Sequence, residues 1–132
     1  MVLSNNILID TNVLVYMYEN KKDIFEVALN LIPNAKFFVL DLSFDEIDKI
    51  FKDKKKRREY LKRYLKKLEE QNKFEIIKTE AQLREKFYNV DSVLVYLSSK
   101  YLIYTNDKKL KWKLKNRGKK VLTLRVKGAY VL

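Results

Sequence analysis

The first recognisable unit of the chain is Ile7-Leu8-Ile9-Asp10-Thr11-Asn12-Val13-Leu14. Residues 7–9 form a short, uniformly aliphatic run of the kind expected for a parallel strand that is buried on both faces. An acidic residue, Asp10, follows directly, and a helical pattern begins at Val13. A strand, an acid and a helix in this order indicate the opening of an α/β fold.

The same alternation continues to the end of the chain. Further apolar runs at residues 37–40, 74–77, 101–104 and 121–124 predict four more strands. Helical patterns cover residues 13–18, 24–32, 81–88, 90–100 and 108–116, and Ser43 to Glu46 resembles a capping box that opens another helix. The basic run 54–58 interrupts the apolar stripe of that helix, which predicts a break and a second helix. We therefore expect an α/β fold over residues 1–132, with a five-stranded, mostly parallel sheet and helices on both faces in a three-layer α/β/α sandwich.

Positive charge is concentrated in two segments. The chain carries 29 Lys and Arg against 17 Asp and Glu, a net charge of +12. Residues 52–67 contain ten basic and two acidic side chains, and residues 108–132 contain ten basic and no acidic ones. Such segments favour binding to a polyanion, with a nucleic acid or an anionic membrane surface as candidates. Alternatively, the basic side chains of these segments simply lie on helix faces that are exposed to solvent.

Missing residue types exclude several chemistries. The 132 residues include no His and no Cys, which rules out Ser-His and Cys-His nucleophiles, disulfides and zinc sites built from these side chains. Two Gly are too few for a Gly-rich phosphate-binding loop. A bound metal would therefore have oxygen ligands, as Mg²⁺, Mn²⁺ and Ca²⁺ prefer.

Features at the level of the whole chain suggest where the protein works. No apolar run approaches the length of a transmembrane helix. The first six residues lack the basic region of a signal peptide, and the absence of Cys fits a reducing compartment. We therefore expect a cytoplasmic protein.

Acidic residues follow the predicted strands. Asp10 and Asp107 come after the first and fourth strands, Glu46 lies beyond the second, and Asp91 opens the helix that leads to the fourth. The carboxyl ends of parallel strands form the ligand-binding edge of such a sheet, so these acids are expected to converge there. A hard divalent cation would offset their mutual repulsion. Each acid also has a structural alternative, as a helix N-cap or as the partner of Ser43 in the capping box.

Four segments resemble, in order, the motifs of PIN-domain ribonucleases. The first is the 7–14 stretch, the second is 39–50 with Glu46, and the third is Asn89-Val90-Asp91-Ser92-Val93-Leu94. The fourth is Tyr104-Thr105-Asn106-Asp107-Lys108-Lys109-Leu110, followed by Gly118 and Val121-Leu122-Thr123-Leu124. PIN domains are α/β/α sandwiches with a five-stranded parallel sheet, so the resemblance implies the fold already expected from the pattern of strands and helices.

The resemblance also implies an activity, namely Mg²⁺- or Mn²⁺-dependent endonucleolytic cleavage of RNA that leaves a 5′-phosphate and a 3′-hydroxyl. Metal-activated water would do the work of a general base, which suits a chain without His. The implied catalytic acids are Asp10, Glu46, Asp91 and Asp107, of which Asp10, Asp91 and Asp107 would be metal ligands, with Asn12 and Thr105 as supporting polar residues.

The implied partner is RNA, either a structured RNA or a ribosomal precursor, and the two basic segments would bind its phosphates. Tyr60, Tyr64 and Trp112 are candidates for stacking on unpaired bases, although Tyr64 falls on the apolar stripe of its helix and is predicted to pack in the core. A homodimer or another protein partner is compatible with the family, and no membrane partner is expected. The predicted RNA-binding residues are Lys54, Lys55, Lys56, Arg57, Arg58, Lys108, Lys111, Arg117 and Lys119.

Several functions remain open at this point. The fourth motif and the last strand are closest to the branch of the family that processes ribosomal RNA, although Ser92 stands where that branch often has a second acid. A toxin-type PIN ribonuclease held in check by an antitoxin is one alternative, and a PIN-like module that binds RNA or protein without cutting is another. A phosphatase of the aspartyl-phosphate type is disfavoured, because it needs a second Asp at the position of Asn12.

Overall fold

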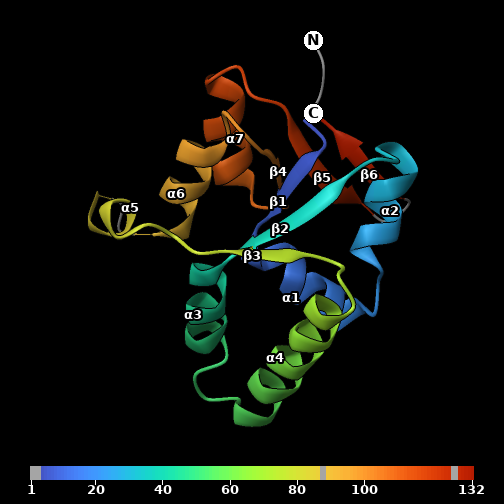
Figure 1. Cartoon of the computed structure of the whole chain (residues 1–132), viewed down its shortest axis with the longest axis vertical. Helices are drawn as coiled ribbons and strands as arrows, with labels where there is room; N and C mark the ends of the chain where they lie inside the picture. The colour runs from blue at the N-terminus through green and yellow to red at the C-terminus, as the bar shows by residue number, and fades with distance from the viewer. Residues whose placement is uncertain (1–3, 87–88, 126–127) are drawn as a thin grey trace.

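A six-stranded sheet runs through the centre of the structure, a computed structural model that describes residues 4–86, 89–125 and 128–132 (Figure 1). The strand order is β3-β2-β1-β4-β5-β6. The elements, in chain order, are β1 (Asn6–Ile9), α1 (Thr11–Asn20), α2 (Ile24–Leu31), β2 (Lys36–Leu40), α3 (Asp41–Ile50), α4 (Lys55–Glu70), β3 (Glu75–Ile77), α5 (Ala81–Lys86), α6 (Val90–Leu97), β4 (Leu102–Tyr104), α7 (Lys108–Asn116), β5 (Val121–Arg125) and β6 (Gly128–Val131).

The topology makes β1 the point at which the strand order reverses. The chain proceeds from β1 to β2 and β3 on one side and then returns to β4 and β5 on the other. All neighbouring pairs from β3 to β5 are parallel, and Leu8 lies opposite both Phe38 of β2 and Ile103 of β4. Open parallel sheets bind ligands beyond the carboxyl ends of the strands at such a switch point.

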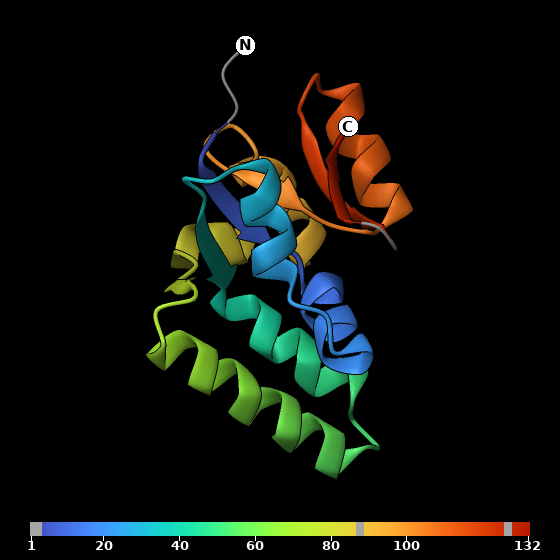
Figure 2. The same ribbon diagram turned by 90° about the vertical axis from the view of Figure 1, so that its right-hand side faces the viewer.

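Helices cover both faces of the sheet, which confirms the predicted three-layer arrangement (Figure 2). Alternate residues of each strand point to opposite faces. Ile7 and Ile9 belong to the core under α1, α2, α3 and α4, whereas Leu8 belongs to the core under α6 and α7. All three side chains are completely buried, as the uniformly apolar run predicts for a strand covered on both sides.

Polar side chains define where several helices begin. Asp10, Asp23, Asn89 and Asp107 are the N-caps of α1, α2, α6 and α7, and each accepts a hydrogen bond from a backbone N–H of the first turn. Asp10 and Asp107 therefore do act as caps, but Asp91 does not, because Asn89 caps α6. At the other end of α7, Gly118 adopts a φ of 72°, which suits glycine and ends the helix as predicted.

The predicted capping box of Ser43 and Glu46 is wrong. Helix α3 begins at Asp41, and its N-cap residue Leu40 makes no side-chain cap hydrogen bond. Ser43 therefore lies inside the first turn, where it is fully buried. Glu46 lies in the second turn, so its carboxylate is not needed to satisfy a helix terminus.

The number of strands also differs from the prediction. The five predicted strands are present, and β6 adds a sixth that pairs antiparallel with β5, Thr123 lying opposite Tyr130.

The predicted break between two helices is confirmed by residues 51–54, which separate α3 from α4. The helix predicted over 90–100 ends at Leu97, and that predicted over 81–88 is observed as α5, with residues 87–88 outside the described part of the chain. None of the described helices is long and apolar enough to cross a membrane.

Candidate active site

The carboxyl ends of β1 and β4 bring two of the predicted acids into one hydrogen-bonded unit. Asp10 is only 4% exposed, and its Oδ1 accepts a hydrogen bond from Thr11 N at 2.8 Å. Its other oxygen, Oδ2, accepts one from Thr105 Oγ1 at 2.7 Å. The same threonine hydroxyl accepts a hydrogen bond from Asp107 N at 3.0 Å. The fully buried Thr105 therefore links Asp10 to the start of the segment that carries Asp107.

The other two acids come from helices that lie beside this edge of the sheet. Glu46 projects from α3, and Asp91 lies in the first turn of α6. Both are half-buried, and α3 contacts α1, which Asp10 caps, as well as α6. Glu46 lines a cavity of about 280 Å³ together with Lys49, Arg84 and Asn89. Four acids from four different places in the chain are thus grouped around the switch point.

Burial and mutual repulsion disfavour the charged forms of three of these acids. Burial raises the pKa of Asp10 from 3.8 to about 7; the hydrogen bond from Thr105 opposes this rise, and the charges of Asp91 and Glu46 add to it. Burial likewise raises the pKa of Glu46, with the nearby Thr11 hydroxyl opposing it and Asp91 adding to it. The pKa of Asp91 is raised by burial and by the charge of Asp107. All four acids therefore interact electrostatically.

The donor set fits a hard divalent cation. Apart from backbone groups, the site offers carboxylate and hydroxyl oxygens, which Mg²⁺ and Mn²⁺ prefer. Among the described buried side chains, Ser43 Oγ has no hydrogen-bond partner, and Ser43 lies one turn before Glu46 on α3. An unpaired buried hydroxyl on the helix that carries Glu46 indicates a polar site that an ion and its water would complete. As the described side chains stand, no three acids form a ready-made ligand group.

Asn106 is a structural residue of the site that sequence reasoning missed. Its Oδ1 accepts hydrogen bonds from Leu124 N at 2.9 Å and from Thr123 Oγ1 at 3.1 Å, so it attaches the loop after β4 to β5. Its own backbone N–H donates to Asn12 Oδ1 at 3.4 Å. The predicted supporting residue Asn12 therefore contacts this loop, in which Asn106 directly precedes Asp107. The Thr-Asn-Asp order of residues 105–107 is the only local signal of this arrangement.

Two lysines near the acids were also missed. The positive charge of Lys49 acts on Glu46, and that of Lys113 acts on Asp91, in both cases lowering the carboxyl pKa. Lys49 lies one turn after Glu46 on α3, a spacing that could have identified it. Lys113 lies on α7, and only the packing of α7 beside α6 brings it to Asp91.

The predicted RNA-binding residues lie on two separate surfaces. One group lies at the start of α4 and consists of residues 54–58. The other group lies along or just after α7 and consists of Lys108, Lys111, Arg117 and Lys119. The two helices occupy opposite ends of the view in Figure 1. Lys111 Nζ donates to Thr123 Oγ1 at 3.4 Å, and the other members are mostly exposed. The structure brings the four acids together but does not bring these two basic groups together.

The aromatic candidates for base stacking are all accessible. Tyr60 is 54% exposed and Trp112 is 67% exposed. The prediction that Tyr64 packs in the core is wrong, because 39% of its surface is exposed. Leu61, Leu65 and Leu68 supply the buried stripe of α4 instead, and Tyr64 lies at its edge.

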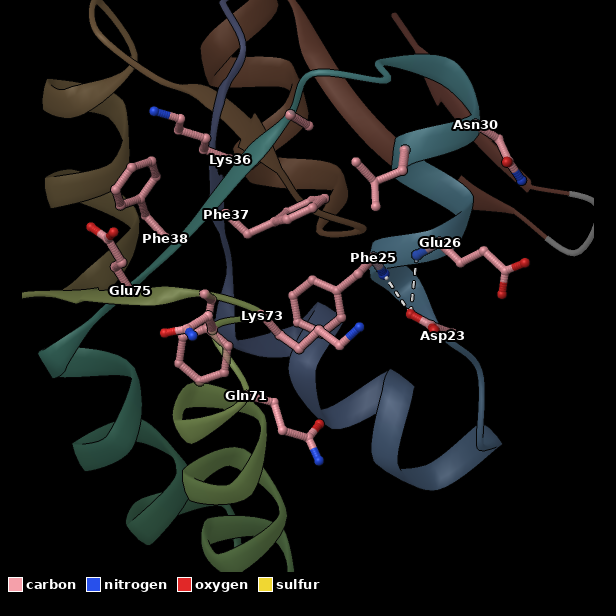
Figure 3. A pocket seen from close by; sticks show the side chains of 14 residues that line it. Asp23, Phe25, Glu26, Asn30, Lys36, Phe37, Phe38, Gln71, Lys73 and Glu75 are labelled. Atoms are coloured by element: carbon pink, nitrogen blue, oxygen red, sulfur yellow. Dashed lines mark hydrogen bonds between the residues drawn. The ribbon is translucent and has the colours of Figure 1, made fainter.

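A separate cavity lies away from the acids. It encloses about 680 Å³ between α2, β2, β3 and the turn after α4 (Figure 3). Phe25 packs edge-on against Phe37 there, with ring centroids 5.0 Å apart, and Asp23 accepts hydrogen bonds from Phe25 N and Glu26 N at its rim. None of the four acids lines it. We therefore assign the candidate active site from the acids and not from the volume of a cavity.

The fold and the acidic switch point define a class of protein that is confirmed by comparison with known families. Residues 7–127 match the model of the family described as PIN like domain. The chain therefore belongs to this family, and the resemblance noted in the sequence motifs is confirmed.

Two known proteins illustrate the relationship. The chain is 32% identical over 113 residues to Ribonuclease VapC9 of Archaeoglobus fulgidus, an alignment that covers 84% of this chain and 76% of that protein. The structure is similar to that of the PIN domain endonuclease Utp24, with a TM-score of 0.70 over 96% of this chain and 90% of that chain. Since the identity to Utp24 is 22%, this second similarity concerns the fold alone.

Proposed function

We propose that the protein is an endoribonuclease that hydrolyses RNA phosphodiesters with the help of Mg²⁺ or Mn²⁺. One observation carries the proposal: Asp10, Glu46, Asp91 and Asp107 interact at the switch point of a protein with a net charge of +12. A cluster of acids that repel one another destabilises the folded protein and repels a polyanion, unless a bound cation neutralises their charge. The 32% identical relative is named a ribonuclease, which supports RNA as the substrate.

Each acid has a distinct place in the proposed chemistry. Asp10, Asp91 and Asp107 would hold the metal, and Glu46 would help to bind a second ion or orient the attacking water. Thr105 holds Asp10 through its hydroxyl, and Asn12 holds the loop that precedes Asp107. When bound, Mg²⁺ or Mn²⁺ would polarise the scissile phosphate and lower the pKa of a water molecule.

The reaction is an in-line displacement by water at phosphorus. The bond from phosphorus to the 3′-oxygen breaks, which leaves a 3′-hydroxyl on one fragment and a 5′-phosphate on the other. The 2′-hydroxyl takes no part, so no cyclic phosphate forms. Analysis of the product ends separates this route from one in which the 2′-hydroxyl attacks.

The raised pKa of Asp10 gives the proposal a pH dependence. A metal ligand must be ionised, so cation binding releases the proton that Asp10 holds below about pH 7. Affinity for Mg²⁺, and with it cleavage at limiting Mg²⁺, therefore falls as the pH falls below 7.

The decisive test compares Asp10→Asn with the wild-type protein. The variant should lose RNA cleavage in Mg²⁺, and it should also lose the stabilisation that Mg²⁺ gives the wild type in urea unfolding, a readout that does not depend on activity. Asp53→Asn is the matched control, because Asp53 is an exposed carboxylate in the turn between α3 and α4. Cleavage by Asp10→Asn at the wild-type rate contradicts the mechanism.

A second outcome distinguishes the enzyme from a binding module. EDTA should abolish cleavage and leave phosphate-driven RNA binding largely intact, whereas a non-catalytic module binds RNA and shows no cleavage with or without EDTA.

For the biological role we favour RNA processing. A toxin-type ribonuclease uses the same chemistry, so growth arrest on expression, relieved by the product of a neighbouring small gene, would assign that role instead.

A further inference from the structure

A groove between α6 and α7 is a second feature of the surface near the acids. The two helices pack against each other and enclose a cavity of about 580 Å³, a volume within the usual range of ligand pockets. We call it the α6–α7 groove. Its polar lining consists mainly of Ser92, Tyr96, Ser99, Lys113, Arg117 and Lys119.

The groove lies beside Asp91, although none of the four acids lines it. Ser92 lines its wall and directly follows Asp91 on α6. Lys113 lines the opposite wall, and its charge acts on the Asp91 carboxylate. A chain of phosphates that places one phosphate at the acids can therefore continue into the groove.

The two walls carry complementary chemistry for a single nucleic-acid strand. Lys113 lies in the last turn of α7, and Arg117 and Lys119 follow just after the end of this helix at Asn116. On α6, Ser92 and Tyr96 are four residues apart and so lie on one face of the helix, and Ser99 follows just after its end at Leu97. Cations suit phosphates, hydroxyls suit phosphate and ribose oxygens, and an aromatic ring offers a stacking surface for an unpaired base.

Charge distinguishes this groove from the basic surface of α4. Among the described residues that line the α6–α7 groove there is no acid, and three are cationic. The α4 surface includes Glu59, Glu69 and Glu70, and its Lys62 is already paired with Asp48 at 2.7 Å. Of the two basic segments, the one next to the groove therefore offers phosphates the less compensated positive charge.

We propose that the α6–α7 groove binds the RNA segment adjacent to the scissile phosphate as a single strand. Lys113, Arg117 and Lys119 bind its phosphates, and a base stacks on the ring of Tyr96, which is 52% exposed. This inference rests on the proposed nuclease function, because the acids define which phosphate is cut. It makes Tyr96 and Lys113 substrate-binding residues and gives the α4 surface no part in binding this segment.

The test measures RNA binding in EDTA, so that cleavage does not interfere. The probe is a fluorescein-labelled, unstructured decaribonucleotide of mixed sequence, titrated over a range of salt concentrations. Tyr96→Ala should weaken binding about tenfold, and Tyr96→Phe, which retains an aromatic ring, should bind like the wild type. Lys113 is left unchanged because it also acts on Asp91.

The charge half of the inference has its own matched pair of variants. Arg117→Gln with Lys119→Gln should lower the slope of log affinity against log salt by about 1.4, since each phosphate contact with a single strand contributes about 0.7. Lys66→Gln with Lys67→Gln removes the same charge from exposed positions of α4 and should leave the affinity within about twofold of the wild type. Urea unfolding of each variant shows that the fold is retained.

The outcomes separate this inference from the proposed function. If Asp10→Asn abolishes cleavage but the groove variants bind the decaribonucleotide like the wild type, the nuclease proposal stands and the groove inference is overturned. If the groove variants lose binding while Asp10→Asn still cleaves, the groove stands without the proposed metal site. Tighter binding of a duplex of the same sequence also overturns the inference, because paired bases cannot stack on Tyr96.

Discussion

Removal of the Asp10 carboxylate should stabilise the metal-free protein at alkaline pH. The folded state holds a proton on Asp10 up to about pH 7, whereas an unfolded chain loses it near pH 3.8. Between these values the native state binds more protons than the unfolded state, so the wild type loses stability as the pH rises through this range. Asp10→Asn has no proton to lose at this position, so its stability does not show this fall with rising pH.

The magnitude follows from the position of the pKa. A change from 3.8 to about 7 corresponds to about 4 kcal/mol of stability lost by the wild type above pH 7. Asn also costs something, because the amide NH₂ that replaces Asp10 Oδ2 cannot accept the hydrogen bond that Thr105 Oγ1 donates, a loss of about 1 kcal/mol. The variant should therefore be about 1 kcal/mol less stable than the wild type at pH 4 and about 3 kcal/mol more stable at pH 8.

The assay is urea unfolding in EDTA at several pH values from 4 to 8, followed by far-UV circular dichroism. The quantity of interest is the difference in unfolding free energy between variant and wild type. Glu46 and Asp91 also have raised pKa values, but they are present in both proteins, so the difference isolates Asp10 to a first approximation. Asp53→Asn should follow the wild-type curve at every pH.

One result would refute this reasoning. If the stability curves of Asp10→Asn and wild type run parallel from pH 4 to 8, then Asp10 is not held protonated by burial and the electrostatic description of the site is wrong. A crossing of the two curves at about pH 4.5, where the stability lost by the wild type reaches the roughly 1 kcal/mol that Asn costs, supports it. The same variant would then be more stable and inactive, as expected where function requires a destabilising arrangement of charge.

Three other predictions each test a single position. Thr105→Val removes the hydroxyl that donates to Asp10 and accepts from Asp107 N, so it should raise the pKa of Asp10 further. The acid limb of the pH profile of the cleavage rate should therefore move to higher pH. An acid limb that does not move would argue against the hydrogen-bonded link from Asp10 through Thr105. Leu65→Ala opens a cavity at a fully buried position and should cost about 2–5 kcal/mol in urea unfolding, whereas the neighbouring Tyr64→Ala should cost about 1 kcal/mol or less. Gly118→Ala should cost about 1–2 kcal/mol through its φ of 72° alone, since no atom lies within 4 Å of an added Cβ; an unchanged urea midpoint would contradict this.

Local pattern was sufficient for most of the secondary structure. The run Ile7-Leu8-Ile9 was recognisable as a doubly covered strand because every residue is apolar, and α7 was predicted with its observed bounds because its cap and its stop are local. The four acids could be listed for a similar reason, since each follows a strand or opens a helix in the sequence.

Features that depend on distant partners were not predictable in this way. Strand β6 is short, only partly buried and begins with Gly128, so it lacks the apolar pattern of the other strands and exists through its pairing with β5. Ser43 matched a helix cap locally, but the start of α3 at Asp41 places it in the core. The role of Asn106 lies in hydrogen bonds to β5 that its neighbours in sequence do not reveal.

Residue chemistry and tertiary placement thus contribute different parts of the candidate site. The absence of His and Cys leaves carboxylates and hydroxyls as the ligands for any metal, and this is a property of composition. The raised pKa of Asp10 is a property of the fold, because it arises from burial at the end of β1 and from acids carried by α3 and α6. Desolvation and charge repulsion depend on surroundings and distance in space, and parallel pairing of β1 with β4 brings together residues that lie nearly a hundred positions apart.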